Sequence, residues 1–235
     1  MDEIWHAILM AGAMIWTFDG DLWEVIGRSL NVSLSATGIA AVAGLPLGAL
    51  IALGRFPGRR VLIVLFNALM GLPPVVVGLI VYLLLSRAGP FGVFNLLFTP
   101  TAMTIAQIIL VLPIIVSLSR EILETLWGEY HEALRSLGAS PLQALATLLW
   151  DGRTMLVTAL LAGFGRAVAE VGAVMIVGGN IDHVTRVMTT SITLEASKGN
   201  LSMALGLGMV LLLLSLAINI GAYGFRYAGE RRQPA

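Results

Sequence analysis

Two opposite charges, Arg166 and Glu170, stand four residues apart within a long apolar stretch of this 235-residue chain. That spacing places both side chains on one face of a helix. Charged side chains inside an apolar span are costly unless they are paired, and they often mark ion pathways. We therefore expect Arg166 and Glu170 either to contribute to a translocation pathway or to form a structural ion pair with each other or with a neighbouring helix.

A second unusual segment is Gly71–Gly78, where Pro73 and Pro74 interrupt another apolar run. Proline lacks the backbone N–H and kinks a helix when it lies inside one. Within lipid, the carbonyls freed by a kink need neighbouring helices or a wet cavity as partners. Pro73 and Pro74 are therefore candidates either for lining a pathway or for a kink that serves only packing.

The third segment is a polar, charged island of helical pattern that extends from Glu129 to Pro141. We expect two short helices here, separated near Gly138, because Pro141 suits the first turn of a helix but not its interior. Ser140 is expected to cap the second helix. The first helix would present Glu132 and Ala133 to a soluble partner, since exposed loops often carry function. The alternative is a solvated linker helix.

The elements that position these residues must be membrane helices. The chain is 57% hydrophobic and 12% charged, and its mean hydropathy is +0.90, whereas soluble domains are roughly a quarter charged. Several apolar stretches exceed the roughly 18 residues that a helix needs to cross a bilayer. Continuous apolar runs do not fit the short alternating segments of a barrel. The sequence predicts an all-α polytopic membrane protein.

Five transmembrane helices are expected, at about 25–53, 61–85, 100–119, 154–177 and 200–225. They form one transmembrane domain, 24–228, with a polar loop at 120–153 and a tail at 229–235. Residues 1–23 are expected to form an interfacial helix, because the apolar run Ile4–Trp16 is short for a span and its Trp residues suit the interface. A short first span is the competing interpretation.

The distribution of arginine predicts the orientation. Arg residues gather in the 55–60 turn, in the 120–153 loop and at the C-terminus, whereas Arg87, Arg186 and Lys198 fall on the opposite side. Because cytoplasmic loops carry the excess of positive charge, we expect the N-terminus outside and the C-terminus inside the cell.

Several other functions lack support in the sequence. There is no Cys, and the three His are scattered, so we expect no metal site. The sequence has no nucleotide-binding motif and no basic stripe for nucleic acid, and no arrangement typical of an enzyme. His183 is expected to be a surface residue, and Met188–Ala196 a short helix that could act as an outer gate.

The polar island resembles the coupling loop of ABC importer permeases, through Glu132-Ala133-Leu134 and Gly138 four residues later. It departs from the family pattern at Leu148–Asp151, where Ile-x-Leu-Pro is usual. The whole chain resembles the permease subunits of type I ABC importers for oxyanions. The string from Arg166 through Glu170 to Asn180, together with Met70–Gly78, is most similar to the tungstate group.

This resemblance implies the type I permease fold in a prokaryotic cell membrane, as a homodimer with two cytoplasmic ATPase subunits and an extracytoplasmic binding protein. ATP would be used by the partner subunit, and the chain itself would bind no cofactor. The substrate would be tungstate, or else molybdate or sulfate. A stand-alone secondary transporter is the alternative class, although no internal repeat is evident. The coupling residues implied are Glu129, His131, Glu132, Ala133, Leu134, Gly138, Ala139, Ser140 and Pro141.

Overall fold

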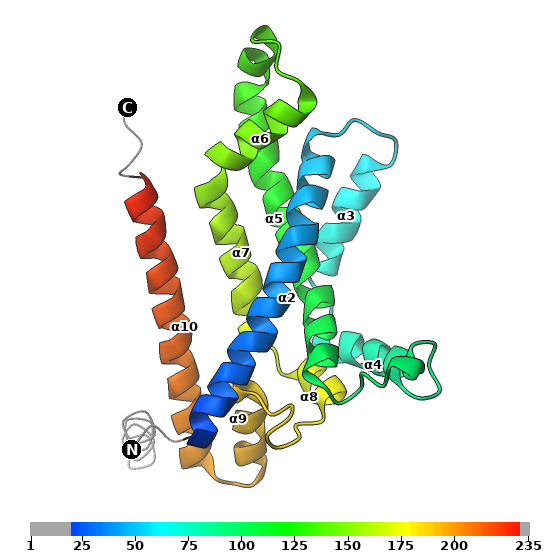
Figure 1. Ribbon diagram of the computed structural model, residues 1–235, viewed down its shortest axis with the longest axis vertical. Helices are drawn as coiled ribbons and strands as arrows, with labels where there is room; N and C mark the ends of the chain where they lie inside the picture. Colours follow the sequence, from blue (N-terminus) through cyan, green and yellow to red (C-terminus); the bar gives the residue numbers. More distant parts are fainter. Residues whose placement is uncertain (1–19, 231–235) are drawn as a thin grey trace.

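The computed structural model describes residues 20–230, in which every regular element is a helix (Figure 1). The helices follow one another along the chain as α2 (Gly20–Leu53), α3 (Arg59–Leu69), α4 (Pro74–Leu85), the 3-10 turn η1 (Gly92–Phe94), α5 (Pro100–Ser136), α6 (Pro141–Asp151), α7 (Arg153–Val168), α8 (Gly172–Gly178), α9 (Met188–Ser197) and α10 (Leu201–Glu230).

The core is built around α5, which α2 accompanies more extensively than any other helix does. The face of α2 that packs on α5 carries a small residue at every fourth position: Ala36, Ala40, Gly44 and Gly48, all buried. A Cβ on Gly44 would lie 2.9 Å from Cγ2 of Ile115, and a Cβ on Gly48 would overlap Oγ of Ser119. Small residues at this spacing let the two helix backbones approach closely, as membrane helices commonly do.

Within residues 20–230, three helices are long and apolar enough to cross a membrane as single spans: Gly20–Leu53, Pro100–Ser136 and the Leu201–Gly221 part of α10. Two bent pairs raise that number to as many as five if each pair counts as one span. The expected span at 61–85 is the pair α3 and α4, which bends by 101° between Leu69 and Pro74. The predicted kink at Pro73 and Pro74 is therefore confirmed, and it is a sharp turn.

Two expected boundaries differ from the structure. The expected span at 100–119 continues without interruption to Ser136, so the first half of the polar island is the end of α5 and not a separate short helix. The expected span at 154–177 stops at Val168 and resumes as α8 at Gly172. Between them, Ala169–Val171 form the α7–α8 break. Side chains on distant helices form hydrogen bonds with the backbone around this break.

The connections gather at two opposite ends of the molecule. The 54–58 turn, the α5–α6 connection and the C-terminal part of α10 lie at one end (Figure 1). The first turn of α2, α9 and the 179–187 loop lie at the other. The described parts of the arginine-rich segments, 55–60, 120–153 and the end of α10, thus share one end. Of the expected interfacial segment 1–23, residues 1–19 lie outside the described part of the chain, and residues 20–23 form the first turn of α2.

Candidate functional site

The ion pair expected from the sequence is present. Nη1 of Arg166, in the last turn of α7, lies 2.5 Å from Oε2 of Glu170. The Glu170 side chain is 2% exposed and that of Arg166 is 30% exposed. The second carboxylate oxygen, Oε1, accepts a hydrogen bond of 3.0 Å from the backbone N–H of Ala173, in the first turn of α8. Glu170 therefore neutralises Arg166 and caps the next helix.

Distant polar side chains satisfy the backbone of the α7–α8 break. Nε2 of Gln107, on α5, donates to the carbonyl of Ala167 over 3.0 Å, and Oγ1 of Thr189, on α9, donates to the carbonyl of Glu170 over 2.8 Å. Unpaired carbonyls in an apolar interior are costly. The carbonyl of Ala167 also accepts from the N–H of Glu170 over 3.2 Å, so Gln107 is its second donor, whereas Thr189 is the donor to the carbonyl of Glu170. Sequence reasoning missed both residues, although a lone amide in the apolar run of 100–119 is a usable signal.

The two candidate pathway segments lie side by side. Pro73 and Pro74 occupy the N-cap and first position of α4, and this end of α4 abuts the start of α8. A Cβ on Gly172 would lie 2.9 Å from Cγ2 of Val75, and a Cβ on Gly78 would lie 2.7 Å from Cα of Ala173. The backbones near the ion pair are thus closely packed at Gly172, whereas a Cβ on Gly165 would meet nothing within 4 Å.

The space beside the break is small. A cavity of about 10 Å³ is bordered by Ser29, Ser33, Gln107, Glu170 and Thr189. That volume suits about one water molecule. In this arrangement the buried side of the break has no room for an oxyanion, and the partly exposed face of Arg166 is the side that faces open space.

The other predicted site is the α5–α6 corner, Leu137–Ser140. Gly138 adopts a left-handed conformation, with φ of 68°, and its N–H donates to the carbonyl of Arg135 over 3.0 Å. The N–H of Ala139 donates to the carbonyl of Leu134 over 3.0 Å. These two bonds form the Schellman motif that ends many helices at a glycine. The corner therefore stops α5 with its own backbone.

The start of α6 is capped as the sequence predicted. Oγ of Ser140 accepts from the N–H of Gln143 over 3.4 Å, and Oε1 of Gln143 accepts from the N–H of Ser140 over 2.8 Å. Pro141 takes the first helical position. This reciprocal capping box satisfies two free donors locally. Local sequence alone thus accounts for the direction change between α5 and α6.

The corner has a buried side and an exposed side. On α6, Ala144 and Leu148 are buried, and Leu148 packs with Leu123 and Leu126 of α5. On the outer side, Leu137 is 82% exposed and Leu142 is 77% exposed. Large apolar side chains at a polar end of a molecule are typical of a partner-binding surface.

The remaining predicted corner residues lie around this apolar surface. Glu129, Glu132 and Ala133 are exposed, and within residues 20–230 the two carboxylates have no ion-pair partner. His131 and Leu134 are half-buried, and the His131 ring centroid lies 5.9 Å from that of Trp127. The polar island thus combines apolar and acidic groups on one accessible surface.

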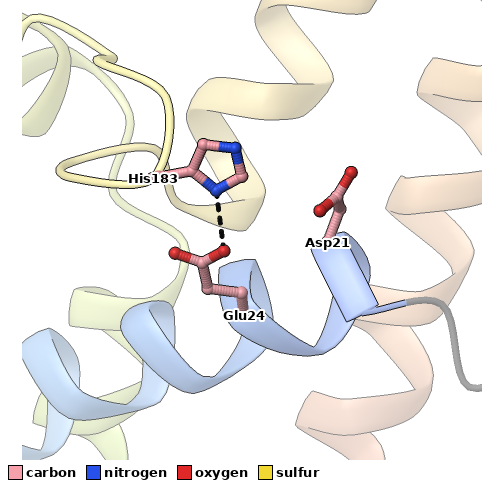
Figure 2. Close-up of side chains that lie close together, drawn as sticks. All are labelled: Asp21, Glu24 and His183. Atoms are coloured by element: carbon pink, nitrogen blue, oxygen red, sulfur yellow. Dashed lines mark hydrogen bonds and ion pairs between the residues drawn. The ribbon is translucent and has the colours of Figure 1, made fainter.

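A group of possible metal ligands, which the sequence did not suggest, lies at the opposite end of the molecule. Asp21 and Glu24 on α2 and His183 in the 179–187 loop gather there (Figure 2). Nδ1 of His183 lies 2.9 Å from Oε2 of Glu24. The hydrogen bond with Glu24 and the nearby Asp182 carboxylate raise the pKa of His183 above its ordinary value. His183 is exposed, as expected, but it has partners.

Comparison with known proteins gives the family. Residues 44–233 match the family described as "Binding-protein-dependent transport system inner membrane component". The chain belongs to this family. The matched residues include the break, the corner and both proline residues of the α3–α4 bend, so all the candidate pathway and coupling residues lie within the family domain of this permease.

Two relatives and one solved structure make the assignment more specific. The permease is 40% identical to the tungstate uptake system permease protein TupB of Peptoclostridium acidaminophilum, over 95% of this chain and 98% of that protein. It is 43% identical to a probable anion ABC transporter permease protein of Haloferax volcanii, over 79% of this chain and 83% of the relative. The MetNI methionine ABC transporter, in an inward-facing conformation, shares its fold, with a TM-score of 0.72 at 20% identity over 92% of this chain and 97% of that chain. The protein is therefore an ABC importer permease of the type I fold.

Proposed function

We propose that this permease forms the translocation pathway of an ATP-driven importer for tungstate. Similarity to a tungstate uptake permease along nearly the whole chain is the observation that carries the substrate assignment. The importer would need a cytoplasmic ATPase, which uses the ATP, and a binding protein that delivers the oxyanion. Molybdate and sulfate are the competing substrates within the same class.

The coupling role is proposed for the α5–α6 corner. Its exposed leucines, unpaired carboxylates and locally capped backbone provide a rigid surface on which an ATPase can dock. From this corner α5 runs without a break for 37 residues, a length of about 55 Å at 1.5 Å per residue. Gln107, near the far end of α5, bonds the backbone of the α7–α8 break. Displacement of the corner would therefore reach the break through one continuous helix.

The pathway role is proposed for Pro73, Pro74, Arg166 and Glu170. Glu170 holds Arg166 and leaves the guanidinium partly exposed, so the site attracts an anion without binding it tightly. Weak binding suits conduction, because a permeating ion must also leave. We propose that two copies of the chain enclose the ion as a homodimer, since Arg166 is partly exposed on the surface of a single copy.

The orientation is testable because the chain has no native cysteine. We propose that the end with the corner and the 54–58 turn is cytoplasmic, in line with its arginines. An Arg60→Cys variant should resist a membrane-impermeant thiol reagent in intact cells, and a Lys198→Cys variant should react. The reverse labelling pattern would contradict the orientation.

The substrate is tested by uptake. Cells that lack their own oxyanion importers should accumulate tungstate when they express this chain with its ATPase and binding protein, as measured by elemental mass spectrometry. Excess molybdate or sulfate should compete weakly. Uptake of sulfate or molybdate in preference to tungstate would contradict the proposed substrate but not the proposed transporter class. Uptake without the ATPase would favour a secondary transporter.

A further inference from the structure

The cluster of Asp21, Glu24 and His183 joins two segments that are far apart in the sequence. One ligand atom from each of the three residues lies within 4.8 Å of the others. Figure 2 shows the Glu24 carboxylate facing the imidazole of His183 in the 179–187 loop, with the Asp21 carboxylate on the preceding turn of α2 to one side of them. One imidazole nitrogen and two carboxylate oxygens are a donor set suited to a divalent transition metal.

The structure holds the imidazole in place through the loop backbone. Nη2 of Arg28 donates to the carbonyl of His183 over 2.8 Å, and Nη1 donates to the carbonyl of Arg186 over 3.0 Å. His183 itself adopts a left-handed conformation, with φ of 54°, which non-glycine residues seldom adopt. The N–H of His183 also donates to Oδ1 of Asp182 over 3.2 Å. The loop is thus fixed on α2 by contacts that do not use the imidazole ring.

The two oxygens of the Glu24 carboxylate have different partners, and one of them can serve as a metal ligand. Oε1 of Glu24 pairs with Arg28, while Oε2 faces Nδ1 of His183. A metal ion can replace the single proton between Oε2 and Nδ1, and Arg28 can remain as the partner that orients the carboxylate. A cavity of about 210 Å³ that borders all three residues has room for the waters that complete the coordination. The positive charges of Arg28 and Arg186 oppose a cation, so binding should be weaker than at a closed structural zinc site.

We propose that Asp21, Glu24 and His183 bind one divalent transition metal ion, with Zn²⁺ and Mn²⁺ as the test ions, and that the ion fastens the 179–187 loop to the first turn of α2. This proposal rests on the cluster alone and does not depend on the transported substrate. It assigns a role to His183, which the transport function leaves unused. The site lies at the end of the molecule opposite the α5–α6 corner (Figure 1).

The test is metal titration of the full chain, purified without a polyhistidine tag and exchanged into chelator-free buffer. Isothermal titration calorimetry with Zn²⁺ and with Mn²⁺ should give about one site per chain. His183→Ala should weaken binding at least tenfold, because it removes the only nitrogen ligand. Asp21→Asn, which keeps the shape of the side chain, should weaken it by a similar factor.

The matched control is the His6→Ala/His131→Ala variant, which removes the other two histidines of the chain and should bind as the wild type does. Size-exclusion chromatography and circular dichroism establish that each variant is folded. Absence of saturable binding to the wild type would overturn the proposal. So would equal affinity in the wild type and in folded Asp21→Asn, or loss of binding in the control variant. A Co²⁺ spectrum with tetrahedral or five-coordinate bands, lost in His183→Ala, would support it.

Discussion

The α5–α6 corner and the α7–α8 break interrupt helices over a similar number of residues, but they satisfy their backbones differently. At the corner, Gly138 ends α5 and Ser140 begins α6, each through bonds to neighbouring residues. At the break, Gln107 and Thr189 reach in from α5 and α9. The corner is locally determined and exposed. The break adds tertiary contacts to its local bonds, and Glu170 within it is buried whereas Ala169 is exposed.

This difference matches the roles proposed for the two regions. A docking surface benefits from a shape that its own sequence fixes, because it must keep that shape while the partner moves. A pathway segment benefits from contacts between separate helices, because movement of one helix then changes the other. Substitutions in the break should therefore affect stability and transport together, and substitutions in the corner should affect coupling with little loss of stability.

The largest effect on stability and transport is expected at Arg166 and Glu170, the ion pair of the break. Arg166→Ala leaves the Glu170 carboxylate buried without its counter-charge, and uncompensated buried charges cost about 3–5 kcal/mol. Glu170→Ala should cost somewhat less, because Arg166 is partly exposed. Arg166→Ala/Glu170→Ala should recover most of the stability and still fail to transport. Thermal unfolding in detergent and oxyanion uptake measure the two properties.

A double-mutant cycle decides whether the pair serves only as scaffold. Near-normal uptake by the double variant would remove Arg166 and Glu170 from the pathway and leave them as a structural pair. Arg166→Lys provides the matched control, since it keeps the charge but not the planar donor group.

The next largest effect on stability is expected for glutamine, which can be replaced in both the break and the corner. Gln107→Leu removes the buried side-chain donor to the carbonyl of Ala167, which keeps its bond of 3.2 Å from the N–H of Glu170, so it should cost about 1–1.5 kcal/mol. Gln143→Leu removes half of an exposed capping box and should cost about 0.5–1 kcal/mol. Both are measured as shifts of the unfolding midpoint. Equal losses would contradict the distinction between a tertiary break and a local corner.

A smaller effect on stability, but a large one on function, is expected at Gly138. Asp and Asn both tolerate the left-handed conformation better than other side chains, so Gly138→Asp and Gly138→Asn should fold alike. Gly138→Asp places a charge on the proposed docking surface and should uncouple ATP hydrolysis from transport. Gly138→Asn should remain coupled. Co-purification of the ATPase and substrate-stimulated hydrolysis are the measurements, and identical coupling in both variants would exclude a docking role for this position.

The smallest effect on folding is expected at the exposed leucines of the corner. Leu137→Ser and Leu142→Ser remove apolar surface that contacts little within the chain, so stability should change by less than about 0.5 kcal/mol. Affinity for the ATPase should nevertheless fall. Leu148→Ser, which is buried on the other side of α6, is the control that should destabilise the fold. Unchanged ATPase affinity in the two exposed variants would place the docking surface elsewhere.

The sequence predicted the corner better than the break, because the corner is fixed by local contacts and the break also depends on tertiary ones. Gly138, Ser140 and Pro141 act through their immediate neighbours, so their spacing predicted the turn and the cap. The helix α5 continues to Ser136, beyond the expected end at 119, because the helical pattern continues through the polar residues. The split of the expected span 154–177 depends on Gln107 and Thr189, which no local pattern connects to Glu170. His183 and Glu24 likewise meet only in the fold.

The most direct test is reconstitution of this permease in liposomes with its ATPase and binding protein. We predict that tungstate uptake requires ATP, the ATPase and the binding protein, and that Gly138→Asp abolishes uptake while Gly138→Asn does not. Uptake by the permease alone, driven by an ion gradient without ATP, would contradict it.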